Sequence, residues 1–117
     1  MESEFVSNGI DYGHALAAVK AGHCIARAGW NGKNMCVFMR PADSMPLTIV
    51  PNVKSLPQSI KEQLFARFNG ETRYASGEEI TVSFSAYLCM LAADGTVVNG
   101  WIASQTDALA TDWVVLD

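Results

Sequence analysis

The sequence predicts an α+β fold, in which an N-terminal helix packs on an antiparallel sheet of about five strands that carries an inserted loop and helix. Two observations lead to this prediction. Near the N-terminus, apolar residues recur with helical spacing. Further along, short apolar runs are joined by an Asn-Gly turn at 31–32 and an Asp-Gly turn at 94–95, which are typical of β-hairpins. The length of 117 residues and the apolar fraction of 50% fit one domain over residues 1–117.

The first helix is expected between Asp11 and Ala21. Its apolar positions lie three and four residues apart and line one face, which comprises Ala15, Leu16, Ala18 and Val19. Asp11 is a suitable N-cap, because its carboxylate can accept a hydrogen bond from an amide of the first turn. Gly22 is the expected C-cap.

A β-hairpin is expected after this helix. Its strands are Cys24–Ala28 and Met35–Arg40, and the segment from Gly29 to Asn34 is its turn. Two glycines in that segment flank a Trp-Asn pair, and Asn-Gly is the strongest local signal for a hairpin turn.

The middle of the chain, from about 41 to 77, differs in character from the rest. It contains all 4 prolines of the sequence, which divide it into short extended pieces. Pro57–Phe68 is expected to be helical, with Pro57 at or near its first position and Ile60, Leu64, Phe65 and Phe68 on one face. We interpret this region as an insertion between two halves of the sheet.

The second half of the chain is expected to supply the remaining strands. Ile80–Phe84 alternates apolar and polar residues, and Tyr87–Ala92 is a more buried strand. Val97–Ala103 returns from the Asp-Gly turn. Ser104–Ala110 begins with an S-x-x-D capping pattern and forms a helical turn, and Trp113–Leu116 is the last strand.

Composition excludes several classes of protein. The net charge of -4 argues against a general nucleic-acid coat, so no DNA partner is expected. The longest uncharged stretch, 80–93, has 14 residues, fewer than the roughly 18 that span a bilayer. The acidic first residues and the odd number of cysteines, 3, favour a protein of a reducing cytoplasm without an export signal.

The residues favour binding over catalysis. The sequence contains no GxSxG, P-loop, GxGxxG or HExxH motif. Glu78 and Glu79 are its one adjacent pair of carboxylates, and we interpret them as solvated surface. A zinc site of His23, Cys24 and Cys36 lacks the spacing of a known ligand set, so neither a metal nor a cofactor is expected.

A basic stretch around a tryptophan is the first candidate binding segment. Cys24–Arg40 contains three basic residues and no acidic one. Trp30 lies in its glycine-flanked turn, where the indole ring offers a stacking surface, and the neighbouring Arg27 and Lys33 can balance phosphate charge. The alternative is that Trp30 folds back and covers the hairpin.

The second candidate segment is Trp101–Asp107. Its tryptophan is followed by four hydrogen-bonding side chains at a helix start, which are Ser104, Gln105, Thr106 and Asp107. Free amides at a helix start suit an anion or a ribose. The alternative is that Ser104 simply caps the helix and Asp107 reaches back to it. Together, the two segments indicate a nucleotide-type site.

The two motifs, R-x-G-W-N-G-K at Arg27–Lys33 and W-x-A-S-Q-T-D at Trp101–Asp107, also carry a resemblance. With Leu16 of the first helix and the Asp112-Trp113 pair, they resemble the small phage proteins of the Thoeris anti-defence 2 type. The resemblance covers roughly residues 10–40 and 86–117. The segment between them departs from the shorter members of that family.

The resemblance implies a sponge rather than an enzyme. Members bind the cyclic ADP-ribose signals made by TIR-domain immune proteins and sequester them without cleavage, in the cytoplasm of the infected bacterial host. They are homotetramers with ligand pockets between protomers, and some also hold cyclic di- or trinucleotides of CBASS. No DNA, membrane or cofactor is implied.

The same resemblance assigns ligand contacts to Trp30, Asn31, Trp101, Ser104, Gln105, Thr106 and Asp107. Arg27 and Lys33 are added because of their charge. Two other functions stay open. One is a nucleotide-cleaving enzyme that uses Asp107 or Glu79. The other is a phage structural or protein-interaction module in which the two tryptophans are core or interface anchors.

Overall fold

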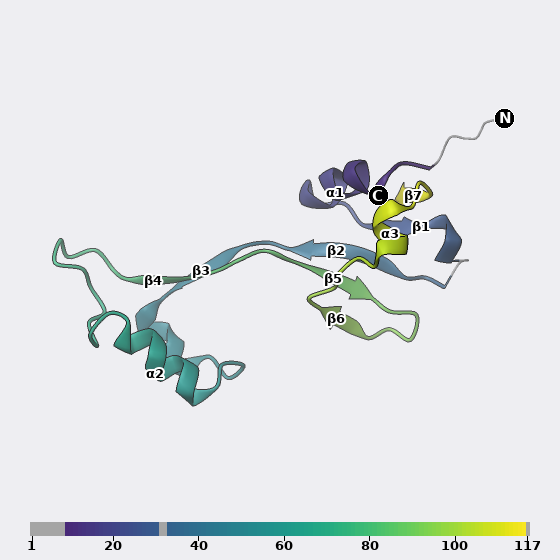
Figure 1. Cartoon of the computed structure of the whole chain (residues 1–117). Coiled ribbons are helices and arrows are strands. Elements are labelled where there is room, and N and C mark those ends of the chain that lie inside the picture. The colour runs from purple at the N-terminus through teal and green to yellow at the C-terminus, as the bar shows by residue number, and fades with distance from the viewer. Residues whose placement is uncertain (1–8, 31–32, 117) are drawn as a thin grey trace. The chain divides into compact units, whose positions relative to one another are not determined.

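A five-stranded antiparallel sheet in the order β6-β5-β2-β1-β7 organises the larger of two structural units in this computed structural model (Figure 1). The structure describes residues 9–30 and 33–116. The larger unit comprises residues 1–41 and 86–117, and the smaller unit comprises residues 42–85. The strands of the sheet are β1 (Ile25–Arg27), β2 (Cys36–Arg40), β5 (Tyr87–Leu91), β6 (Val97–Asn99) and β7 (Trp113–Val115). The predicted α+β class is confirmed.

The predicted hairpin is present. β1 and β2 pair antiparallel with Ile25 opposite Val37, and a 3₁₀ turn (Ala28–Trp30) follows β1. The Asn-Gly pair expected at the tip of the turn lies outside the described residues. β7 pairs with the other edge of β1, which brings Trp113 opposite Arg27. Residues 86 apart in the sequence therefore become neighbours at the end of β1.

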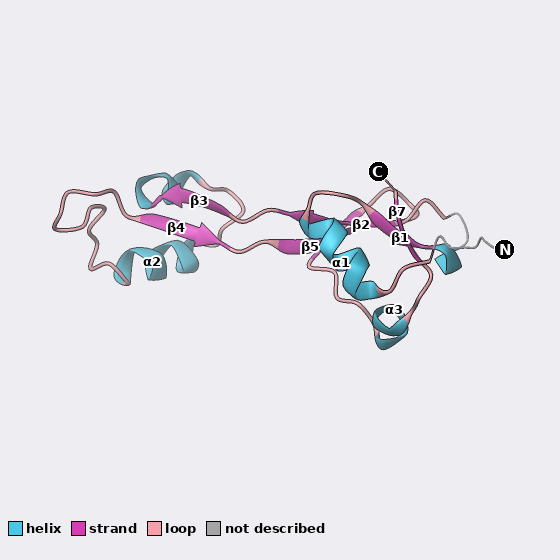
Figure 2. Cartoon of the chain, turned by 90° about the horizontal axis from the view of Figure 1, so that it is seen from above, coloured by secondary structure: helices cyan, strands magenta, loops and turns pink. Residues whose placement is uncertain are grey.

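Helix α1 (Tyr12–Lys20) lies against one face of this sheet, as Figure 2 shows. The predicted N-cap is confirmed, because a side-chain oxygen of Asp11 accepts a hydrogen bond from the His14 amide at 2.8 Å. The predicted C-cap is wrong by one residue. Ala21 caps the helix, and Gly22 follows with φ of 104°, a left-handed conformation that glycine adopts without strain.

The core of this unit forms around Trp113, whose exposed fraction is 0%. Its buried neighbours are Ala15, Val19, Ile25 and Val37. Three further aromatic rings contact Trp113, with centroid separations of 5.3 Å for Tyr12, 5.4 Å for Trp30 and 6.3 Å for Trp101. Both tryptophans of the candidate motifs therefore pack on one core side chain.

The second motif spans the end of β6 and the start of α3 (Gln105–Leu109). β6 is shorter than the predicted 97–103 strand, because Gly100 has φ of 75° and turns the chain. The predicted helical turn is confirmed, and Ser104 caps it by accepting a hydrogen bond from the Asp107 amide at 3.1 Å. No helix in the described part of the chain is both long enough and apolar enough to cross a membrane.

The smaller unit pairs β3 (Asp43–Pro46) antiparallel with β4 (Thr81–Phe84), and it contains a 3₁₀ helix (Leu47–Asn52) and helix α2 (Gln58–Ala66). The helix expected from Pro57 is confirmed, with Pro57 as its N-cap. The strand expected at 80–84 is also present, but its expected place among the remaining strands of the main sheet is wrong, because it pairs with β3. Period-two alternation predicts a strand and a buried face, but it does not identify the partner strand.

Candidate functional site

An ion-pair cluster joins the two candidate motifs. Arg27 at the end of β1 donates from Nε to Oδ1 of Asp112, just before β7, at 2.8 Å. It also donates from Nη1 to Oδ1 of Asp107 in α3, again at 2.8 Å. We call Arg27, Asp107 and Asp112 the Arg27 cluster. It connects segments that are 80 and 85 residues apart in the sequence.

The backbone of the first motif is attached to the same cluster. The Gly29 amide donates a hydrogen bond to Oδ2 of Asp112 at 2.7 Å. A Cβ at Gly29 would lie 2.9 Å from that oxygen, which is closer than real Cβ contacts. The close approach of this carboxylate therefore favours glycine in R-x-G-W, because a side chain at this position would make the Asp112 carboxylate shift.

The hydrogen bonds between Arg27 and the two aspartates favour the charged form of all three groups. The hydrogen bond from Arg27 lowers the pKa of Asp112 below the usual aspartate value, against the opposing effect of burial. Burial raises the pKa of Asp107, but hydrogen bonds from Arg27 and Ser104 outweigh it and the pKa is lowered. Hydrogen bonds to Asp112 and then Asp107 raise the pKa of Arg27. All three groups are thus charged at neutral pH, and the cluster has one cation for two anions.

The tryptophans lie directly beside this cluster. Nε1 of Trp113 donates to the backbone oxygen of Asp107 at 2.8 Å. The rings of Trp30 and Trp101 each meet the Trp113 ring edge-on, at an interplanar angle of 78°. Trp30 and Trp101 are both half-buried. Each ring therefore contributes to the core and keeps part of its surface exposed.

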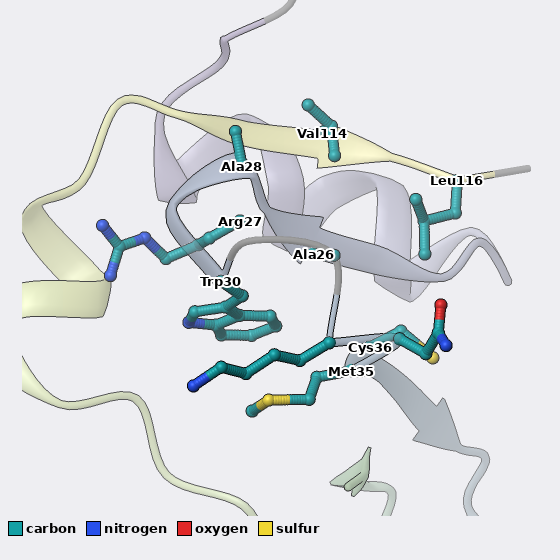
Figure 3. Close-up of a pocket in the computed structure, with 10 residues that line it drawn as sticks. Ala26, Arg27, Ala28, Trp30, Met35, Cys36, Val114 and Leu116 are labelled. Carbon is teal, nitrogen blue, oxygen red and sulfur yellow. The ribbon is translucent and has the colours of Figure 1, made fainter. Parts of the chain in front are cut away.

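A cavity of about 370 Å³ opens beside Trp30 (Figure 3). Its apolar lining comprises Ala26, Ala28, Met35, Cys36, Val114 and Leu116. Lys33 and Arg27 also line it. In Figure 3 the guanidinium of Arg27 points away from Cys36 and Leu116. The stem of Arg27 thus contributes to the cavity while its charged end reaches the two aspartates.

The structure places the remaining predicted site residues as follows. Ser104 is exposed at the N-cap of α3, and Gln105 and Thr106 are exposed in its first turn. None of the described residues of Trp101–Asp107 lines the cavity beside Trp30. Asn31 lies outside the described residues. The structure therefore connects the two motifs through the Arg27 cluster and through Trp113, and it leaves their assignment as ligand contacts a prediction.

Sequence reasoning missed the part that Asp112 plays in this site. Asp112 lies outside both motifs, although it forms the link to Gly29. The only signal in the sequence was the Asp112-Trp113 pair noted with the two motifs. Among residues 9–30 and 33–116, no group of three or more His, Cys, Asp or Glu side chains is arranged to hold a metal ion.

Comparison with known proteins shows what the sequence of this chain is similar to. The sequence profile of the Thoeris anti-defense 2-like domain matches residues 10–116. The chain is also 25% identical over 107 residues to a protein of Bacillus phage SP01 named Thoeris anti-defense 2. That alignment covers 92% of this chain and 94% of the phage protein. The profile match includes the smaller unit as well as the sheet that carries the motifs.

Proposed function

The chain belongs to the Thoeris anti-defense 2-like family, and we propose that it binds cyclic ADP-ribose signals made by TIR-domain immune proteins and sequesters them without cleavage. Family membership supports a phage anti-defence role, which is exerted inside the infected host cell. To this role the proposal adds the ligand, sequestration as the mode of action, and the residues that bind the ligand.

One observation supports the ligand class above the others. Trp30 is half-buried, lines an apolar cavity and has Lys33 on the same cavity wall. A purine can stack on the exposed part of the indole, and an ammonium group can pair with a phosphate. Adenine and diphosphate are both present in cyclic ADP-ribose. The same chemistry suits cyclic di- or trinucleotides, which we include as a second ligand class.

Two observations support a site completed between protomers of a homotetramer. The cavity of about 370 Å³ is at the small end of the range for ligand sites, about 300–1,000 Å³. In the larger unit, several apolar side chains are strongly exposed, with Ile102 at 86% and Leu109 at 80%. Contact with a second protomer would bury these side chains. A second protomer can therefore add ligand contacts that one chain lacks, among them those proposed for Gln105 and Thr106.

The state of Asp107 supports binding without cleavage. Its carboxylate accepts a hydrogen bond from Arg27 at 2.8 Å, and its pKa is lowered. A general acid needs a raised pKa, so Asp107 is not suited to that role. Its Oδ1 is also engaged by Arg27, which disfavours the nucleotide-cleaving alternative based on this residue.

Isothermal titration with cyclic ADP-ribose and its cyclic isomers tests the proposal. We expect wild-type protein to bind one of them with sub-micromolar Kd, which requires about 8 kcal/mol. Trp30→Ala should abolish binding, and Trp30→Phe should weaken it while preserving the contact with Trp113. Tyr74→Ala, in the smaller unit, is the aromatic control and should bind normally.

Stability measurements on the same proteins separate the sponge from an interaction module. If Trp30 is only a core anchor, Trp30→Ala lowers the melting temperature and Trp30→Phe has no binding defect beyond that of Tyr74→Ala. Failure of wild-type protein to bind any of these cyclic nucleotides would contradict the proposed function.

A further inference from the structure

The charge balance of the Arg27 cluster bears on how the site works. The Arg27 side chain is 17% exposed, and its Nε and Nη1 groups both donate to carboxylates. Asp107 is equally enclosed, at 17%, and Asp112 is 34% exposed. One cation shared by two anions presents no net positive charge to an approaching phosphate. An anionic ligand could reach the Arg27 guanidinium on these two edges only by displacing a carboxylate.

We propose that Arg27 is a positioning residue of the binding site and not a ligand contact: through Asp112 it holds the turn that carries Trp30, and through Asp107 it holds the start of α3. This inference rests on the proposed function for its ligand. It assigns Arg27 and Asp107 a different role from the ligand contacts expected from the sequence. It also gives Asp112 a role in the site.

The contacts form a closed path that explains how the cluster acts on Trp30. Asp112 accepts the Gly29 amide, and Gly29 precedes Trp30 in the chain. On the other side, the backbone oxygen of Asp107 accepts from Trp113, whose ring packs on Trp30. Asp112 therefore holds the backbone next to Trp30, and the Trp30 ring is held by its T-shaped contact with Trp113, whose Nε1 donates to Asp107. A ligand that meets a ring already held in place does not have to order it on binding.

The substitution Asp112→Asn distinguishes a positioning role of Arg27 from direct ligand contact, because the two roles predict opposite changes in ligand affinity. Asparagine keeps the shape of the side chain but replaces one acceptor oxygen by an NH₂ group. Arg27 Nε and the Gly29 amide are both donors, so one of them loses its acceptor. If Arg27 bound phosphate, removing a competing negative charge would strengthen binding. If Arg27 positions the turn, binding weakens.

We expect the Kd for the cyclic ADP-ribose isomer that wild-type protein binds best to rise about tenfold or more in Asp112→Asn and in Arg27→Gln. The salt dependence of Kd should stay as in wild type for Arg27→Gln. Lys33→Gln is the matched control. It removes a cavity-lining cation outside the cluster and should reduce the salt dependence.

A second measurement needs no ligand. In ligand-free protein, Arg27→Gln and Asp112→Asn should reduce the near-ultraviolet circular dichroism of the packed tryptophans, with the far-ultraviolet spectrum unchanged. Lys33→Gln should leave both spectra unchanged. If Arg27→Gln does not fold, Arg27→Lys, which keeps the cation but loses the fork of donors, is measured in the same way and should show the same direction of change.

Unchanged or tighter binding by Asp112→Asn, or a reduced salt dependence in Arg27→Gln, would overturn the positioning role. Unchanged near-ultraviolet spectra in both variants would also overturn it. If wild-type protein binds no cyclic nucleotide, the proposed function fails, while the spectra still decide whether the cluster holds Trp30.

Discussion

The contact between Gly29 and Asp112 makes a quantitative prediction about a single methyl group. In Gly29→Ala, the new Cβ would lie 2.9 Å from Oδ2 of Asp112, so the carboxylate must move. The hydrogen bond from the Gly29 amide, now 2.7 Å long, is then lost or stretched. A hydrogen bond to a charged group contributes about 1.5–3 kcal/mol.

Two effects set the size of the expected change. Gly29 is not among the glycines with positive φ, so alanine fits the backbone and recovers about 0.4–1 kcal/mol from the unfolded chain. We therefore expect a net loss of about 1–2 kcal/mol in the free energy of unfolding. For a chain of this size, that corresponds to a melting temperature lower by roughly 4–8 °C.

A double-mutant cycle with Asp112→Ala, read by thermal and urea unfolding, assigns the cause. In the Asp112→Ala background the oxygen is absent, so Gly29→Ala should cost nothing or be slightly stabilising. Gly13→Ala in α1 is the control, because its nearest neighbour is 3.5 Å away and an alanine there should stabilise the helix by about 0.5–1 kcal/mol. An equal cost of Gly29→Ala in both backgrounds would refute the explanation.

Three further predictions concern stability. The pKa values of Asp107 and Asp112 in the folded protein lie below 3.8. The stability that these two carboxylates add to the folded state is therefore present above that pH, and it declines as the pH falls through the lowered values. The melting temperature should thus fall less in Asp112→Asn than in wild type between about pH 6 and pH 3, and an equal fall would contradict this. Asp11→Ala removes the N-cap of α1 and should lower the free energy of unfolding, measured in urea, by about 1 kcal/mol. An unchanged free energy of unfolding would mean that water replaces the cap. Trp113→Ala, at a fully buried position, should cost about 3–5 kcal/mol, and a cost below that of Asp11→Ala would refute its central place in the core.

Elements that depend on neighbouring residues were predictable from the sequence. The α1 cap needs only the Asp11 side chain and an amide three residues later. The β1–β2 hairpin and the Ser104 cap are similarly local. The partner of β4 was not predictable, because alternation marks a face and several strands satisfy it equally.

In the candidate site, too, the local features were predictable from the sequence and the long-range contacts were not. The two tryptophan motifs were visible in the sequence, and the structure links both to Trp113. The partners of Arg27 were not visible, because they follow it by 80 and 85 residues and are brought to it by the pairing of β7 with β1. From its charge alone, Arg27 was expected to bind a phosphate. In the folded protein its guanidinium instead donates hydrogen bonds to Asp107 and Asp112.

Recovery of the bound small molecule tests the central claim most directly. Purified protein is incubated with the TIR-derived cyclic ADP-ribose signal, washed free of unbound ligand, heated to denature it, and the released compound is identified by mass spectrometry. Sequestration predicts that the intact cyclic signal returns, in proportion to the protein used. A cleaved product would contradict the account, and so would the absence of any retained nucleotide.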